Sequence, residues 1–195
     1  MSLFVRGCLR HGQHLVVLGA TGAAGRATLQ LARSAAGRVT AVGLEPDVLD
    51  EQLVAGLTTD AIQLGTDETT DALLAAAHTA DVAIDYLWGA VAEQLWAAVG
   101  AARRPHGRTL RHVQTGTMAG ARAKLTGATL RGADLRLIGS APGAYSFSDL
   151  MAQVPALLER MAADGLTVAH TPFFLADLAA GWASTDRART VFDLR

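Results

Sequence analysis

The residues whose spacing most clearly indicates a binding function form one glycine-rich segment, Gly19–Gly25, which reads GATGAAG. It follows a short apolar run, His14–Gly19, that is typical of a buried strand. It opens an Ala-, Leu- and Arg-rich stretch, Ala24–Ala36, that is typical of a helix. A glycine-rich turn between a strand and a helix is the setting of a dinucleotide-binding loop, although its spacing here is GxxGxxG rather than GxGxxG.

Each position of this loop has a physical role in that interpretation. Gly22 lets the backbone approach a pyrophosphate, and Gly25 lets the helix pack tightly on the strand. The amides of Ala23 and Ala24 lie at the helix N-terminus, where unpaired N–H groups and the helix dipole favour an anion. The loop therefore predicts residues 21–25 (Thr21, Gly22, Ala23, Ala24 and Gly25) as a pyrophosphate site. A tight turn without a ligand is the alternative.

The end of the second predicted strand should select the cofactor. It reads Gly43-Leu44-Glu45, at the distance of about 20 residues where a carboxylate binds the ribose 2′-hydroxyl of NAD. Gly43 instead leaves room for the 2′-phosphate of NADP, but no Lys or Arg follows to neutralise that phosphate. Glu45 can equally be a solvated helix-cap residue. The cofactor is thus NADP or NAD, with the choice open.

Short apolar runs alternate with stretches of helical composition along most of the chain. We expect strands over His14–Gly19, Arg38–Gly43, Ala61–Leu64, Asp81–Tyr86, Leu110–Gln114 and Leu135–Gly139. We expect helices over Ala24–Ala36, Pro46–Ala55, Thr70–Ala77, Ala90–Ala102 and Phe147–Ala163. Such alternation with short connections indicates a parallel sheet covered on both faces. We predict an α/β fold, a doubly wound Rossmann sheet in three α/β/α layers with strand order 3-2-1-4-5-6.

The later part of the chain has a weaker pattern. Gly116–Gly132 is the one long connection without a clear period. The tail indicates a strand near Leu166–His170, a helix near Leu175–Ser184 and a last strand at Thr190–Phe192.

Composition excludes several classes of protein. The 195 residues fit one domain, and half of them are hydrophobic, which excludes a disordered chain. The net charge of −1 gives no positive field for nucleic acid. The only cysteine, Cys8, forms no internal disulfide, and the N-terminus lacks the pattern of a secretory signal. No apolar run is long enough to span a membrane, so we expect a cytoplasmic protein.

The sequence gives little indication of other catalytic sites or of a metal site. Tyr86 follows a strand at the expected cofactor edge, but a packing role suits it better than proton transfer. The GATG start resembles that of atypical short-chain reductases. Their Tyr-x-x-x-Lys pattern, however, is absent at Tyr86 and at Tyr145. His11 and His14 have a metal-compatible spacing without a third ligand, so we expect no metal site. The catalytic residues are unknown.

Several motifs together resemble a known family. Five segments occur in the order found in zinc-independent medium-chain dehydrogenases/reductases of the quinone oxidoreductase-like branch. They are HLVVLGATGAAGRATLQLAR, VAIDYLWG, HVQTGTMAG, LRLIGSAPG and the tail TPFFLADLAAGWAS. The resemblance runs from about His11 to Arg195. It implies a domain that binds NAD(P)(H) for hydride transfer to a small carbonyl or quinone acceptor.

The resemblance also assigns residues by position. Ala23 and Ala24 would hold the pyrophosphate. Residues 43–45 (Gly43, Leu44 and Glu45) would flank the adenosine ribose, Tyr86 and Leu87 would line the cofactor, and Thr115, Gly116 and Thr117 would border the nicotinamide ribose. Relatives often carry Arg where this chain has Leu44, a departure that puts an NADP preference in doubt.

The resemblance further implies two regions, a cofactor domain at 1–165 and a remnant of the catalytic domain at 166–195. Only thirteen residues precede the first strand, too few for the family's N-terminal GroES-like domain. We therefore keep two functions: an oxidoreductase, or a cofactor-binding module that works alone or is completed by a partner chain. Relatives pair their last strands, and the corresponding Leu135–Gly139 is apolar and poorly guarded by charge, so we expect a homodimer through that edge.

Overall fold

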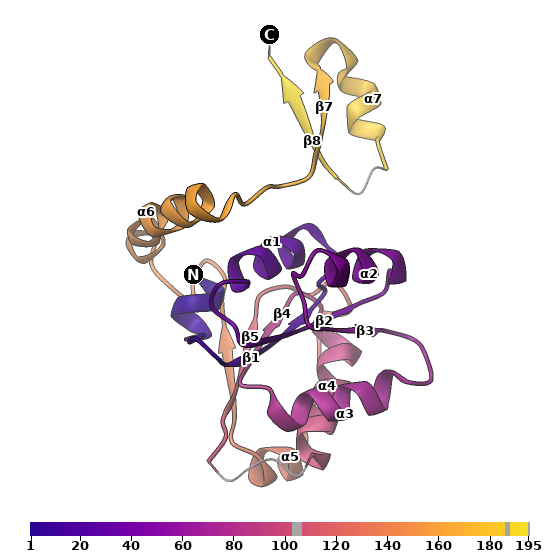
Figure 1. The fold of residues 1–195 in the computed structure, drawn as a ribbon, viewed down its shortest axis with the longest axis vertical. Helices are drawn as coiled ribbons and strands as arrows, with labels where there is room; N and C mark the ends of the chain where they lie inside the picture. The colour runs from indigo at the N-terminus through magenta and orange to yellow at the C-terminus, as the bar shows by residue number, and fades with distance from the viewer. Residues whose placement is uncertain (103–106, 186–187, 195) are drawn as a thin grey trace.

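A computed structural model gives the structure of this chain and describes residues 1–102, 107–185 and 188–194. Residues 103–106, 186–187 and 195 lie outside the described part, including Arg195 at the end of the expected 166–195 region. The fold is a six-stranded parallel sheet with helices on both faces, followed by a separate two-stranded sheet (Figure 1).

The six strands of the main sheet pair in the order β3-β2-β1-β4-β5-β6, which confirms the predicted doubly wound α/β arrangement. They are β1 (His14–Leu18), β2 (Arg38–Gly43), β3 (Asp60–Gln63), β4 (Val82–Asp85), β5 (Leu110–Gln114) and β6 (Leu135–Gly139). The order reverses between β1 and β4, because β2 and β4 flank β1 on opposite sides. In doubly wound sheets, ligands bind at this reversal, outside the carboxyl ends of the strands.

Helices cover the two faces of this sheet. On one face lie α1 (Ala23–Ala32) and α2 (Pro46–Val54); on the other lie α3 (Thr69–Thr79) and α4 (Gly89–Ala101) (Figure 1). Pro46 at the first position and Asp47 in the first turn favour the start of α2. A short π-helical turn, η1 (Ser2–Arg6), precedes β1.

The strands alternate their side chains between two apolar clusters. Leu15 and Val17 of β1 belong to the cluster with Leu29 of α1, whereas Val16 and Leu18 belong to the opposite cluster. These four side chains of β1 are all fully buried. A strand buried on both faces must be a continuous apolar run, which explains the sequence of β1.

The chain after β6 is built differently. Its elements are α6 (Phe147–Asp164), β7 (His170–Phe174), the 3-10 turn η2 (Leu175–Asp177), α7 (Leu178–Ala183) and β8 (Arg189–Asp193). A capping box between Ser146 and Asp149 begins α6, and Gly165, with φ +63°, ends it. The parallel strands β7 and β8 form a small sheet with α7 against it, standing apart from the main sheet (Figure 1).

The structure adds one element to the later chain and places another differently from the expectation. The connection Gly116–Gly132 contains a short helix, α5 (Gly127–Gly132), begun by the Thr126 side chain, which accepts a hydrogen bond from Thr129 N. Six residues are too few to show a helical period. The tail strand lies at His170–Phe174 rather than at 166–170.

The shift of the tail strand accompanies a contact between residues far apart in the sequence. The Gln30 side chain of α1 accepts from Thr167 N and donates to Thr167 O, both at 2.9 Å. This pair of bonds holds the backbone of Thr167 against α1, so the strand begins only after it. In the part of the chain that the structure describes, no helix has both the length and the apolar character needed to cross a bilayer.

Candidate functional site

The residues predicted to bind a dinucleotide come together at the carboxyl ends of neighbouring strands. Residues 21–25 follow β1, residues 43–45 end β2 and begin α2, residues 86–87 follow β4, and residues 115–117 follow β5. Because β2, β1, β4 and β5 are adjacent and parallel, all four segments share one edge of the sheet. This edge includes the reversal of strand order, so we take it as the candidate site.

The glycine loop presents free backbone to this edge. Gly22 is the N-cap of α1, and among the described residues no side chain caps this helix. Gly22, Ala23 and Ala24 are exposed. The first amides of an uncapped helix are unsatisfied donors in the positive end of the helix dipole. The loop can therefore accept an anionic group from solvent.

Two glycines of the loop are required by close approach. A Cβ at Gly25 would lie 2.2 Å from the Gly19 carbonyl oxygen, so α1 packs on the loop only with glycine there. Gly19 has a φ of +87°, a conformation that favours glycine. By contrast, a Cβ at Gly22 would meet only the Gly19 oxygen, at 3.5 Å. The space over Gly22 is therefore open for a ligand.

The second strand end carries a contact that the sequence did not reveal. Thr21 donates a short hydrogen bond to the Glu45 carboxylate, and the Thr21 methyl lies over Gly43, where a Cβ would come within 2.5 Å of it. The Arg26 side chain donates through Nε to the Thr21 carbonyl at 3.0 Å. Glu45 is half-buried and Leu44 is 64% exposed. The carboxylate is thus held at the strand end, in place to accept from a hydroxyl.

The β4 and β5 ends are joined by backbone hydrogen bonds. The amides of Thr115 and Gly116 donate to the Asp85 carbonyl at 2.8 and 3.1 Å, and the Ala119 amide donates to the Leu87 carbonyl at 2.7 Å. Thr117 is exposed beside them. Thr115 Oγ1 is buried without a hydrogen-bond partner among the described residues.

Tyr86 points away from this edge toward α1. Its hydroxyl lies 2.6 Å from Thr28 Oγ1. Burial raises the pKa of the Tyr86 phenol above its ordinary value, and the hydrogen bond with Thr28 offsets part of that rise. The phenol therefore stays protonated at neutral pH and ties β4 to α1, which agrees with the packing role expected for it.

A buried polar network under the β4 loop was missed by the sequence reasoning. His112 Nε2 lies 2.9 Å from Asp85 Oδ2, and Trp96 Nε1 donates to His112 Nδ1 at 3.1 Å. Asp85 and His112 are both fully buried. The available signal was a carboxylate at the end of an otherwise apolar strand, with a histidine in the strand that follows it.

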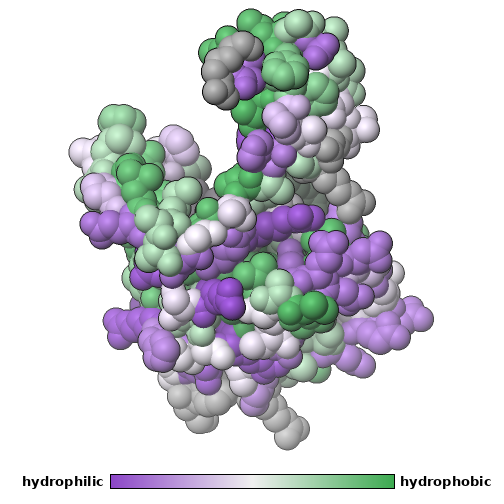
Figure 2. Space-filling view, turned by 45° about the horizontal axis from the view of Figure 1, so that its top comes forward, coloured by the Kyte–Doolittle hydropathy of each residue, from purple (hydrophilic) through white to green (hydrophobic). Residues whose placement is uncertain are grey.

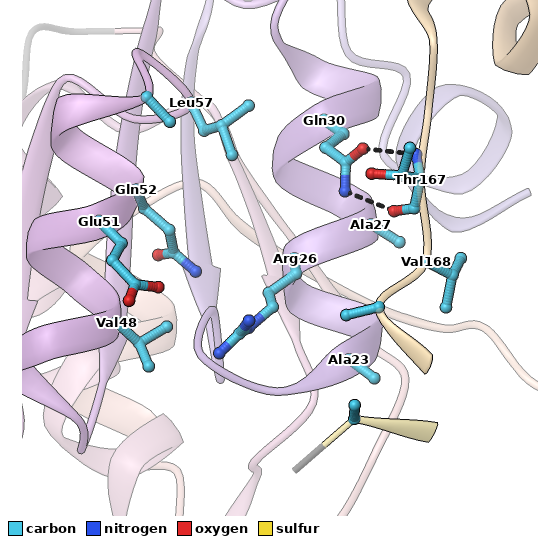
Figure 3. A pocket seen from close by; sticks show the side chains of 13 residues that line it. Ala23, Arg26, Ala27, Gln30, Val48, Glu51, Gln52, Leu57, Thr167 and Val168 are labelled. Atoms are coloured by element: carbon cyan, nitrogen blue, oxygen red, sulfur yellow. Dashed lines mark hydrogen bonds between the residues drawn. The ribbon is translucent and has the colours of Figure 1, made fainter. Parts of the chain in front are cut away.

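A cavity of about 430 Å³ lies beside the glycine loop (Figure 3). Arg26 from α1 and Glu51 and Gln52 from α2 face each other across it, and the segment at Thr167 closes one side. Of the predicted site residues, only Ala23 lines it. Over the described ranges, no three His, Cys, Asp or Glu side chains gather as a metal site.

Comparison with known proteins shows the fold of this chain. No family model and no curated protein matches the sequence. Among solved structures, CurA from Vibrio vulnificus in complex with NADPH matches with a TM-score of 0.73 at 15% identity, over all of this chain and 60% of that one. A quinone oxidoreductase from Pseudomonas syringae pv. Tomato DC3000 matches with a TM-score of 0.72 at 16% identity, over 97% of this chain and 59% of that one.

AibC gives a TM-score of 0.78 at 21% identity, over 98% of this chain and 51% of AibC. The chain thus has the fold of one part of these three proteins and spans between about half and three-fifths of their length. At these identities the likeness concerns the fold alone, and it agrees with the predicted doubly wound α/β arrangement.

Proposed function

We propose that this chain is the NAD(P)(H)-binding part of an oxidoreductase of the quinone or enone reductase-like medium-chain family. The observation that carries the proposal is the uncapped N-terminus of α1, which opens at the reversal of strand order with its first residues exposed. The NADPH complex of CurA, which shares the fold, supports the same ligand class.

The residues fit a dinucleotide along the sheet edge. The amides of Ala23 and Ala24 would hold the pyrophosphate, and Glu45 would accept from the adenosine ribose. Leu87 and residues 115–117 would border the nicotinamide half, where Thr115 Oγ1 has no partner among the described residues. When bound, the nicotinamide would supply a hydride to a small carbonyl or quinone acceptor.

A second candidate function is a binding module without turnover of its own, or one that a partner chain completes. The tail favours it: among the described residues β7 and β8 form a sheet of only two strands, and Phe174 of β7 and Trp182 of α7 are 63% and 82% exposed. A two-stranded sheet of this kind gains stability from further strands or packing. Because the tail has this small sheet of its own, we also propose that the chain divides into a cofactor domain, residues 1–165, and a remnant of a catalytic domain, residues 166–195.

Two measurements test the proposal. Calorimetric titration of the 195-residue chain with NADH and NADPH should show saturable binding of at least one nucleotide; binding of neither would refute it. Oxidation of the bound nucleotide in the presence of a panel of quinones and enones then separates the two functions. Turnover supports the enzyme, and binding without turnover supports the module.

We also propose a homodimer through β6. This strand pairs with β5 on one side, its other edge has no strand partner among the described residues, and Leu137 is 43% exposed on it. Parallel edges of this kind readily add a strand from another chain. Size-exclusion chromatography with light scattering should give twice the chain mass, and a monomer would contradict the dimer.

A further inference from the structure

Two fully buried ionisable side chains, Asp85 and His112, have no part in the chemistry proposed above. His112 has a fixed hydrogen-bonding pattern: Trp96 donates to Nδ1, and an indole N–H can only donate. Nδ1 must therefore accept, and Nε2 must carry the proton that it donates to the Asp85 carboxylate at 2.9 Å. The imidazole is held as a single neutral tautomer.

The other carboxylate oxygen of Asp85 fixes the loop after β4. Asp85 Oδ1 accepts from the amides of Leu87 and Trp88, both at 2.8 Å. Trp88 has a φ of +59° and a ψ of −153°, a conformation that a non-glycine residue holds only when its surroundings fix it. The Trp88 ring also packs edge-on against the rings of Trp96 and His112, with centroids 5.1 and 6.0 Å apart.

This loop lies between the glycine loop that follows β1 and the loop that follows β5. The Leu87 side chain packs on the glycine loop, where a Cβ at Gly19 would come within 3.1 Å of Leu87 Cδ2. The Leu87 carbonyl accepts from the Ala119 amide of the β5 loop at 2.7 Å. A shift of Leu87 would therefore move the wall on which the nicotinamide half is proposed to lie.

We propose that Asp85, oriented by His112, is a positioning residue that shapes the nicotinamide end of the dinucleotide site through the Leu87 and Trp88 amides. The inference rests on the proposed function, because it assigns one end of that same site. The adenosine end at Glu45, the N-cap residue of α2 just after β2, lies on the other side of β1 from β4.

An Asp85→Asn variant tests the network by reversing the direction of the hydrogen bond between residue 85 and His112. The new carboxamide keeps an oxygen for the two amides, but it turns an NH₂ toward His112 Nε2. The imidazole must then accept at Nε2 and carry its proton at Nδ1, where it faces the Trp96 N–H. Two buried donors would point at each other, a costly arrangement. Adding Trp96→Phe removes one of them.

The probes are NADH and ADP-ribose, or NADPH and 2′-phospho-ADP-ribose, according to which nucleotide the wild-type chain binds more tightly. ADP-ribose keeps the adenosine and pyrophosphate but lacks the nicotinamide. We expect Asp85→Asn to weaken binding of the whole dinucleotide about tenfold and that of ADP-ribose less than about twofold. Asp85→Asn/Trp96→Phe should recover most of the loss, and Trp96→Phe alone should bind like the wild type.

A purely structural network would change both affinities by the same factor, or neither, and either result would overturn the positioning role. If Asp85→Asn does not fold, His112→Leu and His112→Gln replace it. Gln can still donate to Asp85 and should bind normally, whereas Leu cannot and should lose the dinucleotide selectively. Equal behaviour of the two would also overturn the role. A wild-type chain that binds neither probe instead refutes the proposed function itself.

Discussion

The part of the chain up to β5 and the part after it differ in how they are held together. Over the described residues, every buried hydrophobic side chain precedes residue 114, and the 18-residue helix α6 contains no buried residue. Figure 2 shows the later elements projecting from the body with apolar surface on them. The sheet that positions the glycine loop therefore has its own core, whereas the later chain exposes apolar side chains that another surface could cover.

The largest difference between the two regions should be seen with matched leucines. Leu29 of α1 is fully buried in the core, and Leu158 of α6 is 57% exposed. We expect Leu29→Ala to lower the free energy of unfolding by about 3–4 kcal/mol through lost burial and a cavity, and Leu158→Ala by less than about 0.5 kcal/mol. Urea unfolding followed by circular dichroism measures both, and similar losses would contradict the contrast.

The next effect concerns the packing of the glycine loop itself. A methyl group at Gly25 would overlap the Gly19 carbonyl oxygen at 2.2 Å, so α1 would have to move off the loop. Gly25→Ala should therefore destabilise the chain by about 3 kcal/mol. The matched control is Gly132→Ala, since a Cβ there meets nothing within 4 Å. Equal thermal midpoints for the two variants would show that the close approach is not needed.

His14 should make the buried sheet sensitive to acid. Burial, with a further contribution from the Arg38 charge, lowers the pKa of His14 to about 4. Its two ring nitrogens bond Thr79 and Thr40 at 2.9 and 2.8 Å. The unfolded chain takes up the proton below pH 6.5 while the folded chain resists it, so stability is complete above that pH and falls as pH decreases toward 4.

Between pH 7 and pH 5 this group should remove about 2 kcal/mol from the free energy of unfolding. His14→Asn should flatten the pH dependence by that amount in urea unfolding at the two pH values. The exposed tail residue His170 is the control, and His170→Asn should keep the wild-type slope. A wild-type slope in both variants would contradict the prediction.

The smallest effect concerns the choice between the two nucleotides. Glu45, held by Thr21, favours a ribose hydroxyl and repels a 2′-phosphate. Glu45→Gln should raise the affinity for NADPH relative to NADH by about tenfold, which is about 1.4 kcal/mol. Glu159→Gln on the exposed face of α6 removes the same charge from the other region and should change neither affinity. An unchanged ratio in Glu45→Gln would remove Glu45 from the site.

Sequence reasoning succeeded where one local pattern decides the structure. The apolar run of β1 and the glycine loop after it predict the strand, the turn and α1, and the alternation of elements predicts the strand order that the structure has. It failed where a contact distant in sequence decides. Gln30 shifts the tail strand by bonding Thr167, and Asp85 meets His112 only because β4 and β5 are neighbours. The Thr21–Glu45 bond likewise depends on the pairing of β1 with β2.

The most direct test of the account compares nucleotide binding by the wild-type chain and Gly22→Val. Gly22 has an extended backbone, with φ −76° and ψ 165°, and a Cβ there meets only the Gly19 oxygen at 3.5 Å. A valine can therefore fold in place while it blocks the approach of a pyrophosphate to the first amides of α1. Calorimetry should show wild-type binding and a loss of at least about a hundredfold in Gly22→Val at an unchanged unfolding midpoint. Equal affinities in the two chains would contradict the glycine loop as the binding site.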